Sequence, residues 1–173
     1  MVYIPRLTLE EKAISRIALY TFGILHGQQD HKQAQEFIDR ISSVFEVAKN
    51  AKGFIDLARE DWGHYSIPRF FDKNKHAAPL SNLSLWKDLE SVYAFTYRGR
   101  HGETFKKRGE WFLEPEWPTY VAWWVEDDHI PTWEEACKRH EYLHDNGPSP
   151  FAFNFKQPFN DMGQPTTLDR EII

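Results

Sequence analysis

Two polar side chains in an otherwise aromatic stretch are the first candidates for chemistry. The sequence predicts a helix from about residue 88 to 113, and one side of it carries Tyr97, His101, Arg108 and Trp111. On such a helix His101 and Arg108 lie on one line, two turns apart. A histidine in this place can take a proton near neutral pH. Arg108 must meet a carboxylate, an anionic ligand or water, because burying an unpaired guanidinium group is costly.

Both side chains also have an ordinary structural explanation. His101 can complete a hydrogen bond in the core while Arg108 extends its guanidinium group to the surface. The aromatic residues present the same choice, because they pack in cores and dimer interfaces as well as around ligands. The candidate substrate contacts are Tyr97, Trp111, Trp86, Trp123, Trp124 and His26.

A second motif fits a metal centre. Residues 140–144 read H-E-x-x-H, which on a helix places His140 and His144 on one face, with Glu141 as the general base of a zinc hydrolase. The extended form of this motif requires a third histidine at position 150, where this chain has Pro150. The short pattern also arises easily by chance in a chain with eight histidines. We therefore expect no metal, and zinc hydrolysis is the least favoured alternative.

Composition excludes several classes of partner. The 173 residues carry a net charge of −5, which argues against a nucleic-acid partner. No apolar run is long enough to span a membrane, and the N-terminus lacks the apolar core of a signal peptide. The single cysteine, Cys137, excludes an internal disulfide and fits a cytoplasmic location. An aromatic content of 16% suits a pocket for a flat apolar molecule.

The order of the predicted elements indicates a fold. We expect strands over 16–25, 54–61, 82–86 and 119–125, with one helix from Asp30 to Gly53 and the other over 88–113. This βαββαβ order is that of an α+β, ferredoxin-like unit. A third helix begins at a capping box formed by Thr132 and Glu135, and residues 146–148 end it. A short strand over 151–155 follows.

The same strands predict the domain and its assembly. The domain spans 16–159, between an N-terminal arm over 1–15 and a flexible tail over 160–173, and the irregular stretch 62–80 is a lid or an interface arm. The first and fourth strands are apolar on both parities, so both faces of the sheet are predicted to be buried. The two helices of the unit cover only one face. We therefore expect a second copy of the sheet to cover the other face, in a homodimer.

Several segments carry a resemblance to known families. Residues 53–55 and 83–95 resemble the antibiotic-biosynthesis-monooxygenase branch of the dimeric α/β-barrel superfamily. A closer similarity, to the family DUF3291, is carried by residues 95–101, 108–112, 120–124 and 147–153. The positions that match the recurring motifs of that family are His101, Arg108, Trp111, Trp123 and Trp124. This resemblance implies a ferredoxin-like protomer that forms a dimeric α/β barrel, with a ligand site between the helices and the concave sheet. In DUF3291 the position of His140 is usually aliphatic, which counts further against zinc.

These observations favour an enzyme that acts on a small aromatic or polyketide-like substrate, as a monooxygenase without a cofactor. His101 would take a proton, Arg108 would stabilise the resulting anion, and Tyr97 and Trp111 would hold the ring. The same pocket could run a non-oxidative isomerisation or cyclisation, or hold haem with His101 or His26 as axial ligand. The alternative from another class is a binding module without catalysis.

Overall fold

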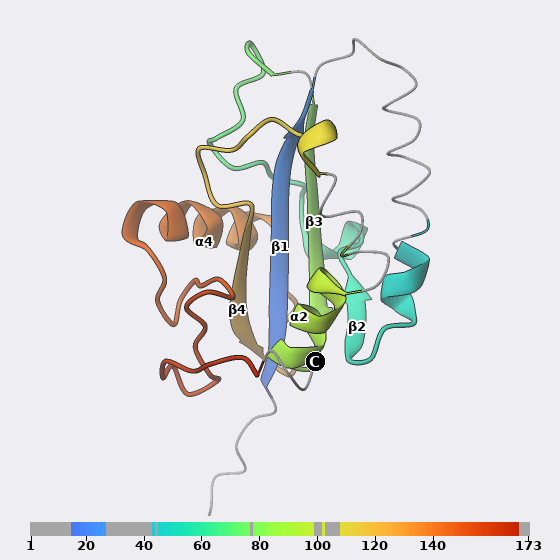
Figure 1. The fold of residues 1–173 in the computed structure, drawn as a ribbon, viewed down its shortest axis with the longest axis vertical. Coiled ribbons are helices and arrows are strands. Elements are labelled where there is room, and N and C mark those ends of the chain that lie inside the picture. Colours follow the sequence, from blue (N-terminus) through green and yellow to red (C-terminus); the bar gives the residue numbers. More distant parts are fainter. Residues whose placement is uncertain are drawn as a thin grey trace, which may run out of the picture.

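Residues 15–26, 43, 45–76, 78–98, 102 and 108–169 are described by the computed structural model. They form a four-stranded antiparallel sheet in the order β2-β3-β1-β4 (Figure 1). The strands are β1 (Ser15–Leu25), β2 (Phe54–Leu57), β3 (Ala78–Trp86) and β4 (Tyr120–Glu126). Helix α2 (Leu89–Tyr97) joins β3 to β4, and residues 45–49 are helical ahead of β2. This order is that of the predicted ferredoxin-like α+β fold.

Strand β1 lies in the interior of the sheet and is buried on both faces. This confirms the prediction from its sequence, in which odd and even positions are both apolar. It pairs with β3 from Ile17↔Trp86 to Leu25↔Ala78, and with β4 on its other edge. Because successive side chains of a strand point to opposite faces, Ile17 and Leu19 enter one core while Ala18 and Tyr20 enter another. The fold therefore has two cores, one on each side of the sheet.

Helix α2 covers one of these faces. Its N-terminus is capped by the Asp88 carboxylate, which accepts a hydrogen bond from the Ser91 N–H at 2.7 Å. Leu89 and Val92 pack on the sheet together with Phe153 and Phe155 from the C-terminal segment. We call this side of the sheet the α2 face.

The predicted continuous helix over 88–113 is wrong. Helix α2 ends at Tyr97, Arg98 is extended, and residues 108–110 form a separate 3₁₀ turn. The backbone at Gly102 lies so close to the Tyr97 carbonyl that an added Cβ would fall 2.5 Å from its oxygen. A chain that folds back this closely on the last turn of α2 cannot continue the helix in a straight line.

The opposite face, which we call the α4 face, is covered by the chain itself. Helix α4 (Trp133–Asn146) contributes Ala136 and Leu143, and the segment 58–76 contributes Trp62 and Phe70. In Figure 1, α2 lies in front of β1 and β3 while α4 runs behind β4. The sequence predicts a homodimer because the two helices of the unit leave this face uncovered. Since α4 and segment 58–76 supply one, the buried faces no longer argue for a twin, and the homodimer stays a prediction.

Helix α4 has the predicted ends. The Thr132 hydroxyl accepts a hydrogen bond from the Glu135 N–H at 3.2 Å, and Gly147 ends the helix with φ of 78°. The following segment 151–155 is not the predicted strand, because it pairs with β4 through the single bridge Ala122↔Phe153. Farther along, Leu168 is 9% exposed and packs in the core of the α2 face.

Other boundaries differ by a few residues. Strand β2 ends at Leu57 rather than residue 61, and β3 begins at Ala78 rather than residue 82. The irregular segment therefore runs over 58–76, with a 3₁₀ turn at Glu60–Trp62. The predicted arm (apart from Ser15), most of the helix from Asp30, and residues 170–173 lie outside the described residues. Within the described part of the chain, no helix is long and apolar enough to cross a membrane.

Candidate functional site

A cavity of about 810 Å³ lies on the α2 face of the sheet, beside the C-terminal half of β1. Its size is within the range of pockets that hold small molecules. Side chains from β1, β3 and α2 line it together with residues 108–115. Its aromatic walls include Phe95, Trp111, Phe112, Tyr120 and Phe155. The cavity is therefore suited to a flat, largely apolar ligand.

Residues 111–113 form one wall by running alongside the end of β1. The His26 N–H donates to the Trp111 carbonyl at 2.8 Å, and the Leu113 N–H donates to the Ile24 carbonyl at 2.9 Å. This extended pairing replaces the last turns of the predicted helix. It brings Trp111 and Phe112 against β1, where both line the cavity.

The hydroxyl groups in the lining are mostly occupied by the protein. Thr96 Oγ1 donates to the Val92 carbonyl at 2.8 Å, and Ser84 Oγ accepts from Trp86 Nε1 at 2.9 Å. The Tyr120 hydroxyl accepts a hydrogen bond from the Phe155 N–H at 3.1 Å. Burial, reinforced by the neighbouring Tyr97, raises the pKa of Tyr120 well above its ordinary value. Tyr120 is therefore a neutral phenol at neutral pH and cannot serve as a base.

The ionisable residues of the lining lie where the cavity opens to solvent. Arg108, His26 and Glu114 line the cavity and are exposed to solvent. A guanidinium group stays protonated and binds carboxylates and other planar anions well. The arrangement can hold an apolar ring in the interior and its anionic group at the mouth.

Three of the candidate residues named from sequence meet in this cavity: Arg108, Trp111 and His26. Arg108 comes from the 3₁₀ turn rather than from a long helix, so helical spacing no longer supports its predicted alignment with His101. His101 itself lies outside the described residues.

The other aromatic residues proposed from sequence do not line the cavity. Trp123 is fully buried in the core of the α4 face, and Trp86 packs against Phe54 and Phe95 beneath α2. Trp124 Nε1 donates to the Phe159 carbonyl at 2.7 Å. Tyr97 is partly exposed and contacts Tyr93 and Phe155. Most of the lining was missed from sequence, including Gly23, Ser84, Thr96 and Phe155. A glycine in the middle of an apolar strand was the available signal for Gly23.

The H-E-x-x-H segment performs a packing role. His140 is fully buried between Tyr20 and Phe22, and its Nε2 donates to the Pro118 carbonyl. Burial lowers the pKa of His140 to about 4, with a smaller contribution from His144. Glu141 accepts a hydrogen bond from the Arg69 N–H at 2.8 Å. Among the described residues, no three His, Cys, Asp or Glu side chains are placed to hold a metal ion.

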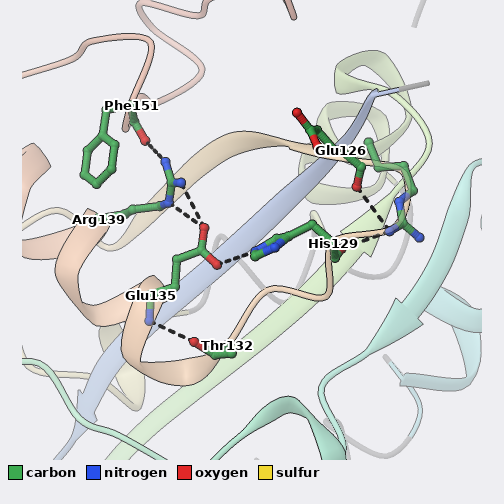
Figure 2. Close-up of polar contacts among 7 residues, drawn as sticks. Glu126, His129, Thr132, Glu135, Arg139 and Phe151 are labelled. Atoms are coloured by element: carbon green, nitrogen blue, oxygen red, sulfur yellow. Dashed lines mark hydrogen bonds and ion pairs between the residues drawn. The ribbon is translucent and has the colours of Figure 1, made fainter. Parts of the chain in front are cut away.

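A second polar cluster holds α4 to its surroundings (Figure 2). Glu135 lies 2.7 Å from His129 Nε2 and accepts from Arg139 Nε at 2.9 Å. The Arg139 guanidinium group also donates to the Phe151 carbonyl and lies 4.2 Å from the centroid of the Phe151 ring. None of these side chains lines the cavity. Arg139 also lies 5.2 Å from the centroid of the Trp123 ring, so the cluster ties α4 to Trp123.

Comparison with known proteins adds the family. Residues 16–169 match the family model described as "Domain of unknown function (DUF3291)". The chain belongs to this family. The DUF3291 model covers both cores and the cavity, so the site described above lies within the domain that defines the family. No curated protein matches this DUF3291 chain.

Solved structures show distant likenesses to this DUF3291 domain. A conserved protein from Methanosarcina mazei Go1 is 16% identical, with a TM-score of 0.44 over 65% of this chain and 93% of its own. A protein of unknown function from Nitrosomonas europaea is 10% identical, with a TM-score of 0.42 and coverages of 68% and 93%. A candidate antibiotic biosynthesis monooxygenase from the same organism is 8% identical, with a TM-score of 0.43 and coverages of 75% and 99%. Scores below 0.5 carry no argument about activity.

Proposed function

We propose that this DUF3291 chain is an enzyme that takes a flat, largely apolar molecule with one acidic proton into the cavity on the α2 face. The observation that carries the proposal is the lining: aromatic walls in the interior and Arg108 at the mouth. Such a cavity binds a neutral aromatic compound by its faces and stabilises it further when it loses a proton. Arg108 then pairs with the anion.

The reaction that fits this arrangement is oxygenation of a carbon acid. A histidine removes a proton from a CH₂ group, and the carbanion supplies electrons to dioxygen. The adduct loses water, so that R₂CH₂ and O₂ give R₂C=O and H₂O. No cofactor is required, because the substrate itself is the reductant. His101 is the base that the sequence predicts, and His26 is the histidine that the described lining contains. Without oxygen, the same base and arginine support isomerisation or cyclisation.

The binding step is tested with 2-naphthoate, a fluorescent aromatic carboxylate. We expect Arg108→Ala to weaken its binding about tenfold or more, because a hydrogen bond to a charged group contributes about 1.5–3 kcal/mol. Arg98→Ala is the matched control, since Arg98 is exposed and lies outside the lining. The thermal midpoints of both variants should stay close to that of the wild type, because neither side chain is buried. Equal affinities for the wild type and Arg108→Ala contradict the proposed site.

The catalytic step is tested with anthrone, a flat three-ring carbon acid. Oxygen uptake with formation of anthraquinone is expected from the wild type, and loss of uptake is expected from His101→Ala or His26→Ala, whichever histidine is the base. Conversion that persists in both variants contradicts a histidine base. If the protein binds carbon acids but converts none of them, the result would favour the alternative of a binding module without catalysis. A Soret band in the purified protein would replace the cofactor-free reaction with haem chemistry, although His26 is exposed and suits the rim better than an enclosed axial position.

Two further proposals concern the setting of the enzyme. A cytoplasmic location is supported by the single free thiol of Cys137, which is buried. A homodimer is supported by the family resemblance alone, since the α4 face is already covered. Native mass spectrometry distinguishes a mass of 20.5 kDa from twice that value.

A further inference from the structure

A glycine and a phenylalanine in the lining of the cavity are in unusually close contact. Gly23 lies in β1, and a Cβ atom added to it would fall 2.6 Å from Cδ1 and 2.9 Å from Cε1 of Phe112. Real Cβ atoms do not approach ring carbons this closely. The ring of Phe112 therefore occupies the space that any other residue at position 23 would fill with its side chain.

The contact between Gly23 and Phe112 lies on the side of β1 that faces the cavity. Side chains alternate along a strand, so position 23 shares its face with Leu19 and Thr21, which both line the cavity. Gly23 and Phe112 belong to the lining as well. The Phe112 ring thus lies against the strand, between the backbone of β1 and the cavity.

The backbone of Phe112 is held in place by hydrogen bonds on both sides. Its own N–H donates to the Arg108 carbonyl at 2.9 Å, and the Leu113 N–H donates to the Ile24 carbonyl at 2.9 Å. Phe112 and Leu25 form an isolated antiparallel bridge. A side chain at position 23 would therefore turn the ring into the cavity rather than displace the backbone.

We propose that Gly23 and Phe112 together set the size limit of the ligand. Glycine weakens the interior of a strand, so a glycine at position 23 needs a compensating benefit. That benefit is the position of the Phe112 ring, which lies directly against the strand. With the Phe112 ring directly against the strand, the rest of the cavity stays open, and the ring is part of the cavity wall. The inference rests on the proposed function, because it assumes that the cavity binds a flat molecule.

The chain offers a matched control for this idea. Gly109 also lines the cavity, but a Cβ added there has nothing within 4 Å. Gly23→Ala and Gly109→Ala therefore add the same methyl group to the same cavity, with and without a collision. The probes are 2-naphthoate, with two rings, and pyrene-1-carboxylate, with four rings, and both are followed by their fluorescence.

The ratio of the two affinities is the quantity to measure. Gly23→Ala should weaken pyrene-1-carboxylate about tenfold more than 2-naphthoate, because the displaced ring shortens the cavity. Phe112→Ala should shift the ratio about tenfold in the opposite direction. Gly109→Ala, whose methyl group displaces no ring, should change the ratio much less than Gly23→Ala does. In the double variant Gly23→Ala, Phe112→Ala the added methyl group meets no ring, so the ratio of affinities should equal that of Phe112→Ala alone.

The outcomes separate this inference from the function on which it rests. If the wild type binds 2-naphthoate through Arg108 but Gly23→Ala and Phe112→Ala both keep the wild-type ratio, the size limit is wrong and the site stands. If the wild type binds neither probe, both proposals fall. Should Gly23→Ala fail to fold, Phe112→Leu and Phe112→Ala decide the question, since both must favour the larger probe.

Discussion

The two faces of the sheet are built from the same strands and differ in how completely they are filled. On the α4 face, Leu83 is fully buried in a closed core beneath α4 and segment 58–76. On the α2 face, Leu19 is 6% exposed and borders a cavity of about 810 Å³. Side chains that border empty space lose van der Waals contacts, so the hollow face stabilises the fold less. The closed face thus provides stability that lets the other face keep room for a ligand.

The comparison also explains why some histidines and aromatic residues pack in a core while others line the cavity. On the α4 face, His140 and Trp123 are enclosed and act through packing. On the α2 face, His26, Arg108 and Trp111 adjoin open space. The same residue types thus pack in a closed core on one face and line a cavity on the other.

The largest expected effect compares one substitution on the two faces. Leu83→Ala should lower the free energy of unfolding by about 3–5 kcal/mol, because it leaves a closed void in the core. Leu19→Ala should cost less, about 2–3 kcal/mol, because it enlarges a cavity that already exists. Urea unfolding of both variants measures the difference. Equal losses would mean that the two faces are equally well packed.

The second prediction uses the buried histidine of the α4 face. The pKa of His140 falls from the ordinary 6.5 to about 4 because of burial, so the unfolded chain binds this proton more readily than the folded protein. The resulting stability is fully present above pH 6.5 and is lost as the pH falls toward 4. The loss attributable to this group approaches about 3 kcal/mol, from 1.36 kcal/mol for each unit of pKa.

Unfolding measured at pH 7, 5.5 and 4.5 tests this pH dependence. In His140→Gln the amide can still donate to the Pro118 carbonyl but cannot titrate, so stability should fall less steeply with acid than in the wild type. His144→Gln is the control, because His144 lies on the same helix and is exposed. An unchanged slope in His140→Gln would show that the acid sensitivity of the fold arises from other groups.

The smallest expected effect concerns the start of α4. Thr132→Ala removes the hydroxyl that accepts from the Glu135 N–H, and should cost about 1 kcal/mol in unfolding free energy. Thr132→Ser keeps the acceptor and should remain close to the wild type. Ligand affinity should be unchanged in both, because α4 lies on the face opposite the cavity. A change in affinity for 2-naphthoate in Thr132→Ala would show that the two faces are coupled.

Some features of this protein follow from sequence alone because they depend on neighbouring residues. The two-sided apolarity of β1 and the caps of α4 at Thr132 and Gly147 act within a few positions, and the structure confirms them. The order of strands and helices follows from the same local patterns and is enough to indicate a ferredoxin-like sheet.

Other features were decided only by the tertiary structure. The sequence predicts that a second copy of the sheet covers the second face, whereas in the structure α4 covers it after the chain returns past β4. Arg108 reaches the cavity because the chain leaves the α2 helix at Arg98 and returns along β1. The meeting of Gly23 and Phe112 joins residues 89 positions apart. Contacts at such separations depend on where every intervening element packs, so local patterns predicted the elements while the assembled cores determined the site.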